Sequence, residues 1–203
     1  MSLPVALALA YLIGAIPASL LAARVGGGID LRQQGSRNLG ATNLYRVLGW
    51  KYAVPVGLFD VAKGALPVWL CSAATRSTEP WVPLAVGGAA VLGHVFSVFV
   101  RFKGGKGVAT AAGVVLALAP VPLLLSAVVW VALLKGTGFV SVASMGGAVA
   151  FPLAALMVGT ENPYVVPVGT GLAGFILLTH RGNIRRLLAG TESRFGRRAR
   201  SAT

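Results

Sequence analysis

Long apolar stretches separated by short polar loops dominate this sequence. A transmembrane helix needs about 20 apolar residues to cross roughly 30 Å of hydrocarbon. The stretches that meet this requirement are residues 3–23, 52–75, 81–100, 139–159 and 163–179. The first basic residue is Arg24, after the first stretch, so we expect a retained span there and not a cleaved signal peptide. The sequence therefore predicts an all-α integral membrane protein.

Composition and charge exclude several other classes of protein. Of the 203 residues, 56% are hydrophobic and 11% are charged, whereas a soluble domain averages about 25% charged residues. The formal net charge of +13 would suit nucleic acid, but the polar exterior of a nucleic-acid-binding protein is missing. The single cysteine, Cys71, permits neither an internal disulfide nor a cysteine cluster for zinc. We therefore expect no nucleic-acid partner, no metal and no cofactor.

The apolar block 107–134 decides how often the chain crosses the membrane. It carries Pro120 and Pro122 near its middle, so it is either one kinked helix or two short helices joined by a proline turn. Two helices place every basic residue except Lys63 and Arg76 on one side, whereas one helix divides the 18 basic residues about evenly. The positive-inside rule favours two. We expect a seven-transmembrane-helix bundle with the N-terminus outside and the C-terminus cytoplasmic, formed by residues 1–192, and a basic cytoplasmic tail, 193–203.

Three polar segments fall on this predicted cytoplasmic side. The first, 35–43, combines Gly35 and Gly40 with hydroxyl and amide side chains, and Arg46 follows it. Glycines allow close backbone approach and the small polar side chains add neutral donors, which together suit a phosphate. The same residue types also cap helices, so the segment alone leaves a capping turn equally open.

The second polar segment, 102–110, opens onto the next apolar stretch. Its central residues are Lys103, Gly104, Gly105, Lys106 and Gly107. Ammonium groups and glycines before a helix N-terminus indicate an anion site. An ordinary basic loop would explain the lysines but not the glycines. A Walker A motif would need glycine at Val100, so we do not expect nucleotide hydrolysis.

The third segment, 179–192, follows the last apolar stretch and is typical of a basic amphipathic helix on the membrane surface. His180 and Asn183 stand where the span emerges, level with the other two loops. Ser141 and Ser144 lie one turn apart at the start of another span, where an interhelical hydrogen bond and a site role are equally compatible with the sequence.

Three polar residues lie inside the spans. Asp60 and Lys63 are separated by three residues, and each charge costs roughly 2.5–3.5 kcal/mol at the bilayer centre, so we expect them to pair or to face the bundle interior. We expect His94 to be a packed or capping histidine. From these residues alone, the sequence indicates chemistry on a phosphorylated lipid or lipid precursor, with transport of a phosphorylated metabolite as the alternative. A transporter predicts polar residues that continue through the spans, whereas here they cluster on one side.

The segments 36–43, 103–110 and 183–192 together resemble the bacterial acyl-phosphate:glycerol-3-phosphate acyltransferases, the PlsY family. The resemblance covers nearly the whole chain and implies a seven-helix, multi-pass protein of the bacterial inner membrane with its active site facing the cytoplasm. It implies transfer of a fatty acyl group from acyl phosphate to the 1-hydroxyl of sn-glycerol 3-phosphate, an early step of phospholipid synthesis. The products would be lysophosphatidic acid and phosphate.

The resemblance also implies roles for individual residues. The expected glycerol 3-phosphate pocket comprises Ser36, Asn38, Thr42, Asn43, Arg46, Lys106, Ser144, His180 and Asn183. The expected acyl-phosphate loop comprises Lys103, Gly104, Gly105 and Gly107. His180 and Asn183 are the candidate catalytic side chains, while a substrate-assisted mechanism, in which the substrate's own phosphate accepts the proton, is favoured. Arg37 departs from the small residue usual there. The expected partners are the two substrates and membrane lipids, and the sequence indicates no particular protein partner.

Overall fold

The computed structural model describes residues 1–196, and the part of the predicted basic tail from 197 to 203 lies outside the described residues. Within the described chain every regular element is a helix, which confirms the all-α prediction. The elements are α1 (Leu3–Ala15), α2 (Ala18–Gly27), α3 (Ala41–Leu48), α4 (Trp50–Thr75), α5 (Val82–Val95), the 3₁₀ helix η1 (Val98–Val100), α6 (Val108–Leu118), α7 (Pro120–Thr137), α8 (Val140–Val158), α9 (Val165–Thr179) and α10 (Arg181–Leu188).

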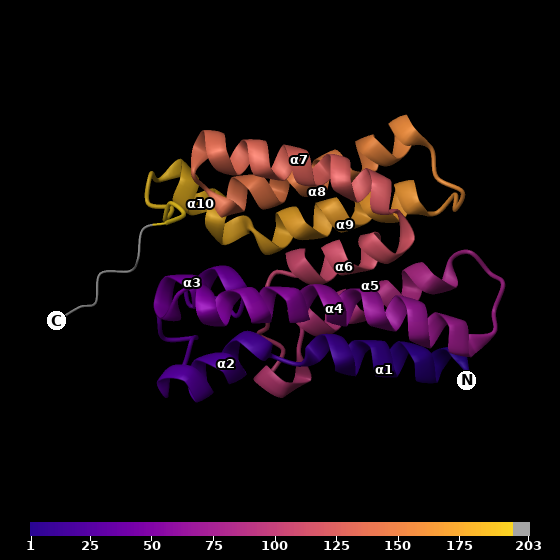
Figure 1. The fold of residues 1–203 in the computed structure, drawn as a ribbon, viewed down its shortest axis with the longest axis horizontal. Helices are drawn as coiled ribbons and strands as arrows, with labels where there is room; N and C mark the ends of the chain where they lie inside the picture. Colours follow the sequence, from indigo (N-terminus) through magenta and orange to yellow (C-terminus); the bar gives the residue numbers. More distant parts are fainter. Residues whose placement is uncertain (197–203) are drawn as a thin grey trace.

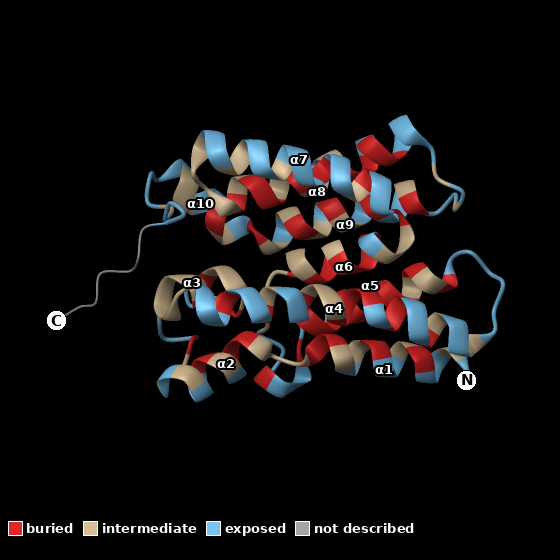
Figure 2. Ribbon diagram, viewed as in Figure 1, coloured by how far each residue is buried: buried red, intermediate tan, exposed pale blue. Residues whose placement is uncertain are grey.

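Five helical stretches among the described residues are long and apolar enough to cross a membrane. They are Leu3–Gly27, Trp50–Thr75, Val82–Val100, Pro120–Thr137 and Val140–Val158, and the shorter apolar helices Val108–Leu118 and Val165–Thr179 accompany them. Many of their large apolar residues are exposed, and Figure 2 shows exposed residues along the outer helices. Apolar residues on an outer surface of this extent suit lipid and not water. The chain is a multi-pass membrane protein.

Prolines interrupt two of the apolar stretches. The block 107–134 folds as α6 and α7, so the predicted proline turn is confirmed: Ala119 turns the chain and Pro120 is the first residue of α7. The stretch 3–23, expected as one span, is instead broken at Ile16 and Pro17 into α1 and α2. Pro17 has no N–H to donate to the preceding turn, which releases backbone carbonyls at the end of α1.

The helices form two groups (Figure 1). One contains α1, α4 and α5, with α2 and α3 at one end, and the other contains α7, α8 and α9, with α10 at the same end. Helix α6 packs on α4 between the two groups. Glycines allow the close pairs: a methyl group on Gly14 of α1 would strike the Ala90 carbonyl of α5, and one on Gly113 of α6 would strike Val61 of α4. Close backbone approach is the usual way in which membrane helices pack.

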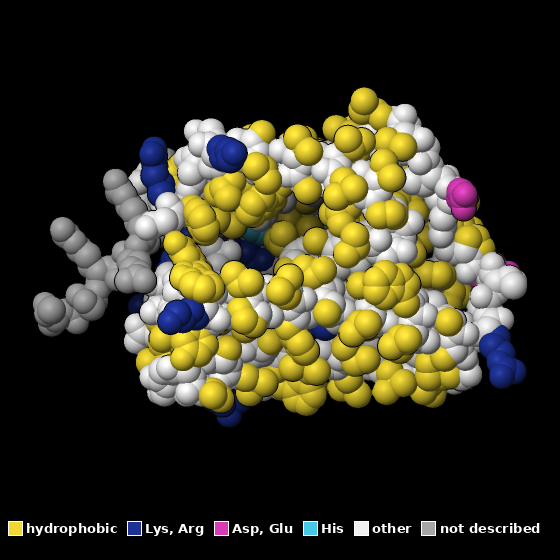
Figure 3. Space-filling model, viewed as in Figure 1, with side chains coloured by type: hydrophobic (Ala, Val, Ile, Leu, Met, Phe, Trp, Pro, Cys, Tyr) yellow, Lys and Arg dark blue, Asp and Glu magenta, His cyan; other side chains and the backbone are white. Residues whose placement is uncertain are grey.

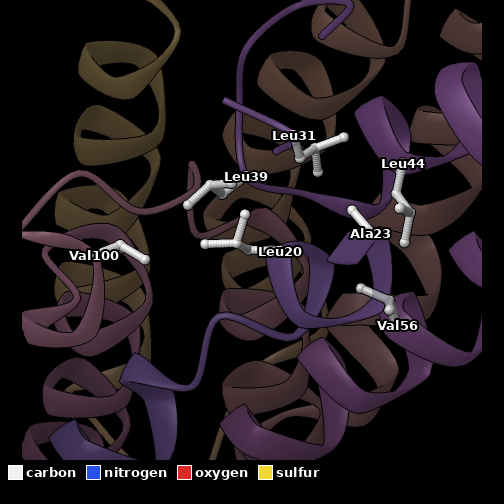
Figure 4. Packing of buried hydrophobic residues seen from close by; sticks show 7 residues of the cluster. All are labelled: Leu20, Ala23, Leu31, Leu39, Leu44, Val56 and Val100. Atoms are coloured by element: carbon white, nitrogen blue, oxygen red, sulfur yellow. The ribbon is translucent and has the colours of Figure 1, made fainter. Parts of the chain in front are cut away.

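The polar loops gather at the end of the bundle that holds α3 and α10. Figure 3 shows Lys and Arg side chains concentrated at this end, and the Asp and Glu side chains in view at the other. An apolar cluster anchors the segment between α2 and α3 here (Figure 4). Its buried members are Leu20, Ala23, Leu31, Leu39, Leu44, Val56 and Val100. Leu31 and Leu39 come from the irregular segment itself, so their burial fixes where the first polar segment lies.

Candidate active site

A cavity of about 420 Å³ lies between the two groups of helices. Figure 3 shows it as a hollow on an apolar face, with basic and histidine side chains inside. Every residue expected in the glycerol 3-phosphate pocket lines it: Ser36, Asn38, Thr42, Asn43, Arg46, Lys106, Ser144, His180 and Asn183. The structure therefore brings together residues from all three polar segments and from α8. Of the expected acyl-phosphate loop, Gly107 lines the cavity, Lys103 is exposed, and Gly104 and Gly105 line a separate small space.

A hydrogen-bond network joins the second and third polar segments through Glu192. The Lys106 ammonium donates to Asn183 Oδ1 at 2.5 Å. Asn183 Nδ2 donates to Glu192 Oε1 at 2.6 Å, and Ser141 Oγ donates to the same oxygen at 2.8 Å. Arg186 Nε donates to the other carboxylate oxygen at 2.7 Å. The carboxylate thereby orients Asn183, which in turn holds the ammonium at the cavity.

Burial and neighbouring charges set the charge state of this network. Burial is the main cause that lowers the pKa of Lys106 to about 8; the cations Arg186 and Arg46 act in the same direction and Glu192 opposes them. For Glu192, burial alone would raise the pKa, but hydrogen bonds from Asn183, Arg186 and Ser141 together hold the carboxyl pKa below its ordinary value. At neutral pH the network is therefore an ionised carboxylate among cations.

Arg46 supplies a second cation from α3. Its Nη2 donates to the Ser193 carbonyl at 3.3 Å. Its Nε is buried and has no hydrogen-bond partner among residues 1–196. Burial lowers the pKa of Arg46 from its ordinary value, but a guanidinium stays charged in proteins. A buried, unpaired guanidinium N–H beside a cavity is a donor available to an anion.

His180 lies directly after α9 and is 2% exposed. Its Nδ1 lies 2.8 Å from the Ile176 carbonyl. Because a carbonyl can only accept, the proton of the neutral ring is on Nδ1 and Nε2 is an acceptor. Burial, followed by the positive charge of Lys106, lowers the pKa of His180 to about 4. The imidazole is therefore neutral at pH 7 and a weak base.

Asn43 holds the first polar segment in place. It is 1% exposed, and its Oδ1 accepts the Ser36 N–H at 2.8 Å. Its amide nitrogen lies within hydrogen-bond distance of the carbonyls of Leu31, Gln34 and Asn38 at 3.0–3.3 Å. Asn43 lines the cavity, but its amide is engaged by the loop, so its main contribution is to present Ser36, Asn38 and Thr42.

The sequence alone gave Glu192 and Trp130 no role in the site, and it left Ser141 open between an interhelical hydrogen bond and a site role. Glu192 and Ser141 belong to the network around Asn183, and Trp130 Nε1 donates to Ser144 Oγ at 3.4 Å. Glu192 carried one usable signal, since it is the only acidic residue in the basic region after residue 179. Trp130 carried none, because its position in an apolar helix is also typical of packing.

The other end of the cavity is apolar. The lining residues farthest along the surrounding helices from the polar end are Val115 of α6, Leu123 of α7, Phe151 of α8 and Gly169 of α9. Ten residues separate Ser141 from Phe151 on α8, which is about 15 Å of helix. One leaflet is half of a hydrocarbon core of roughly 30 Å. The cavity, from its polar end to its apolar end, is thus about as deep as one leaflet.

The fold and the cavity define a class: an integral membrane protein whose site joins a cationic, hydrogen-bonding end to an apolar arm. The sequence model described as glycerol-3-phosphate acyltransferase matches residues 4–190. The chain belongs to the glycerol-3-phosphate acyltransferase family.

Named relatives and solved structures agree. Proteins called glycerol-3-phosphate acyltransferase are 46% identical in Solidesulfovibrio magneticus, over 92% of each chain, and 44% identical in Geobacter sulfurreducens, over 93% of this chain and 95% of that one. A crystal structure of PlsY, an integral membrane glycerol 3-phosphate acyltransferase in its glycerol 3-phosphate form, is similar with a TM-score of 0.87 and 40% identity, over 96% of each chain. The lysophosphatidic acid form has a TM-score of 0.85 and 39% identity, over 96% of this chain and 95% of that one.

Proposed function

We propose that this chain transfers a fatty acyl group from acyl phosphate to the 1-hydroxyl of sn-glycerol 3-phosphate, giving lysophosphatidic acid and phosphate. The observation that carries the proposal is the single cavity that joins cationic donors, among them the unpartnered Arg46 Nε, to an apolar arm, in a chain of the glycerol-3-phosphate acyltransferase family. A water-soluble phosphate ester fits one end and a lipid tail fits the other. The apolar floor of the cavity favours this activity over transport of a phosphorylated metabolite.

Glycerol 3-phosphate binds at the polar end in this proposal. Arg46 and Lys106 bind its phosphate with charge-assisted hydrogen bonds, and Ser36 adds a neutral donor. Asn38, Thr42 and Ser144 line the pocket around the glycerol, with His180 and Asn183 opposite. Asn43 contributes by holding the segment that carries Ser36. Lys103 and the glycines of its loop serve the phosphate of the donor.

The reaction needs positioning more than a nucleophilic side chain, because the acyl donor is already activated. The 1-hydroxyl oxygen attacks the carbonyl carbon, a C–O ester bond forms, and the bond from that carbon to the phosphate oxygen breaks, releasing phosphate. Fixed cations offset the repulsion between two phosphorylated substrates and stabilise the leaving group. Holding the hydroxyl next to the carbonyl carbon accelerates the reaction by proximity and orientation.

The hydroxyl proton goes to the substrate's own phosphate in this proposal. A phosphate ester dianion takes up a proton with a pKa near 6, whereas burial and Lys106 lower the pKa of His180 to about 4. Burial therefore makes His180 a weaker base than a phosphate ester, which favours the substrate-assisted route. His180 Nε2 instead accepts a hydrogen bond from the substrate and orients the hydroxyl.

We propose seven membrane crossings, formed by the helical stretch of α1 and α2 and by α4 to α9. The clustering of basic side chains at the α3 and α10 end supports a cytoplasmic location for that end in the bacterial inner membrane. The N-terminus is then outside and the active site faces the cytoplasm. Residues 1–192 form the transmembrane domain, and the basic tail starts at 193, where Ser193 still contacts Arg46.

The test is an acylation assay on purified protein in lipid vesicles. Labelled glycerol 3-phosphate is supplied with palmitoyl phosphate, or with palmitoyl coenzyme A at the same concentration. We expect labelled lysophosphatidic acid and an equal amount of inorganic phosphate with palmitoyl phosphate only. Equal product from the thioester would contradict the donor, and no product from either would contradict the activity.

A further inference from the structure

The loop that precedes Lys106 rests directly on His94. The Gly105 N–H donates to the His94 carbonyl at 3.1 Å, and the Gly104 N–H donates to the Val95 carbonyl at 2.9 Å. A methyl group on Gly105 would collide with the His94 ring and with the Leu39 carbonyl. Glycine at this position is therefore required by contact with His94.

His94 in turn lies against a buried ion pair. Its Nδ1 is 3.8 Å from Asp60 Oδ1, and the two side chains are only 8% and 4% exposed. Asp60 pairs with Lys63 at 2.7 Å, which confirms the pairing expected from their spacing. Lys63 also donates to the Ile16 carbonyl at 2.9 Å, where Pro17 ends α1. A chain of polar groups thus runs from the break between α1 and α2 to the Gly104–Gly105 backbone, and its step from Asp60 to His94 is a close approach and not a hydrogen bond.

This polar chain forms part of the cavity wall. Asp60 and His94 line the large cavity, and they also line a space of about 10 Å³ together with Lys63, Gly104 and Gly105. His94 Nδ1 has no hydrogen-bond partner within residues 1–196. The small space is close to the minimum that holds one water, and its lining includes the polar side chains of Asp60, Lys63 and His94.

Lys106 is held on both sides of its backbone. On one side the preceding Gly105 rests on His94, and on the other the Lys106 carbonyl accepts a hydrogen bond from Thr179 Oγ1 at 3.1 Å. Stability does not by itself explain the charges, because apolar residues of similar volume often replace a buried ion pair without loss of stability. We propose that Asp60, Lys63 and His94 are positioning residues. They fix the position of the Gly104–Gly105 backbone and thereby direct the Lys106 side chain toward the substrate phosphate.

The inference rests on the proposed function and is tested with three variants. His94→Leu removes the ring that supports the loop, and the double variant Asp60→Asn with Lys63→Met neutralises the pair without leaving an unpaired charge. His94→Gln keeps a polar side chain of similar reach. Tyr11→Phe is the matched control. It removes a hydrogen bond to the Phe96 carbonyl, just after the end of α5, and this bond is not part of the polar chain described above.

The measurements are the Kd for glycerol 3-phosphate by calorimetry, KM and kcat for both substrates, and the melting temperature. We expect His94→Leu and the double variant to raise the Kd and KM for glycerol 3-phosphate about tenfold, the scale of one lost charge-assisted hydrogen bond. His94→Gln should stay within about threefold of the wild type, and Tyr11→Phe should match it.

A lower melting temperature and a smaller active fraction, with unchanged Kd and KM, would show a purely structural role and overturn the proposal. Wild-type affinity in the well-folded double variant would overturn the role of the ion pair. If the wild type binds glycerol 3-phosphate but acylates nothing, the proposed function fails, and the ratio of Kd values between variants and wild type still decides the positioning role.

Discussion

Single side chains set the charge of the site, and burial controls how strongly they act. Arg46 presents a buried Nε with no partner among residues 1–196, while Lys106 is tied to Asn183 and through it to Glu192. The Glu192 carboxylate therefore balances part of the positive charge that remains when no phosphate is bound. In the proposed function, a phosphate completes the arrangement by meeting the donor that Arg46 leaves open.

Replacing Arg46 should specifically weaken use of glycerol 3-phosphate. Loss of a charge-assisted hydrogen bond worth roughly 1.5–3 kcal/mol predicts a 10- to 100-fold rise in KM for Arg46→Ala. Arg185→Ala, which removes an exposed charge from the same end of the bundle, should leave KM within about twofold. Steady-state rates in vesicles measure both. An equal rise in KM in the two variants would indicate that the overall positive charge of this surface attracts the substrate, and not a specific contact with Arg46.

The pH dependence should follow Lys106. In the proposed function its ammonium form binds phosphate, and burial lowers its pKa to about 8, so kcat/KM for glycerol 3-phosphate should fall as pH rises through that value. Kinetics between about pH 6.5 and 9.5 measure this limb, which reports the free enzyme. Lys106→Arg keeps its charge over this range and should flatten the limb. An unchanged alkaline limb in that variant would assign the titration to another group.

At this scale the sequence predicted which residues converge, but not how they interact. Spacing and polarity placed Arg46, Lys106 and Asn183 on one side of the membrane, and the structure brings them to one cavity. The bond from Asn183 to Glu192 could not be predicted, since it depends on how the chain turns after α10. Arg37 was equally opaque: it is exposed and has a φ of 60°, a left-handed conformation unusual for a residue other than glycine.

Helix breaks are the features of individual elements that shape the site. The break between α6 and α7 was predictable because two prolines interrupt a stretch too long for one span. The break at Pro17 was not, because a proline within a stretch of one-span length does not by itself end a helix, as Pro55 and Pro67 inside α4 show. The Ala15 and Ile16 carbonyls it releases are bound by Ser97 and Lys63, which are distant in the chain. Which side chains bind these carbonyls depends on the tertiary fold and could not be predicted from the sequence.

The apolar arm predicts chain-length selection. Phe151→Ala on α8 should extend the arm and raise the preference for longer saturated acyl phosphates by about fourfold per accommodated methylene, the equivalent of roughly 0.8 kcal/mol. Leu156→Ala is the control, because Leu156 lies on the same helix but is 64% exposed. Ratios of kcat/KM across a series of donors measure preference independently of the folded fraction. An unchanged ratio in the Phe151 variant would place the acyl chain elsewhere.

For the whole molecule, the distribution of charge accounts for both topology and site. Basic residues gather at the end that holds α3 and α10 (Figure 3), and the cavity cations Arg46 and Lys106 come from the same end. In the proposed orientation, the positive charge that retains these loops on the cytoplasmic side also supplies the proposed anion site. The apolar outer surface leaves the hollow in Figure 3 facing lipid, which suits a donor delivered from the membrane.

Orientation is tested by labelling single cysteines in a Cys71→Ala background. Thr78→Cys and Thr191→Cys replace exposed residues at opposite ends of the bundle. In intact bacterial cells with a permeable outer envelope, a membrane-impermeant maleimide should label residue 78 directly and residue 191 only after the inner membrane is opened. The reverse pattern would place the site outside.

The most direct measurement is an experimental structure of the protein with glycerol 3-phosphate and a non-hydrolysable acyl phosphonate bound together. The phosphate of glycerol 3-phosphate should lie within hydrogen-bond distance of Arg46 and Lys106, with the 1-hydroxyl at the carbonyl carbon of the analogue. The acyl chain should run toward Phe151. Density for the two ligands in separate sites, or a phosphate away from both cations, would contradict the single shared cavity.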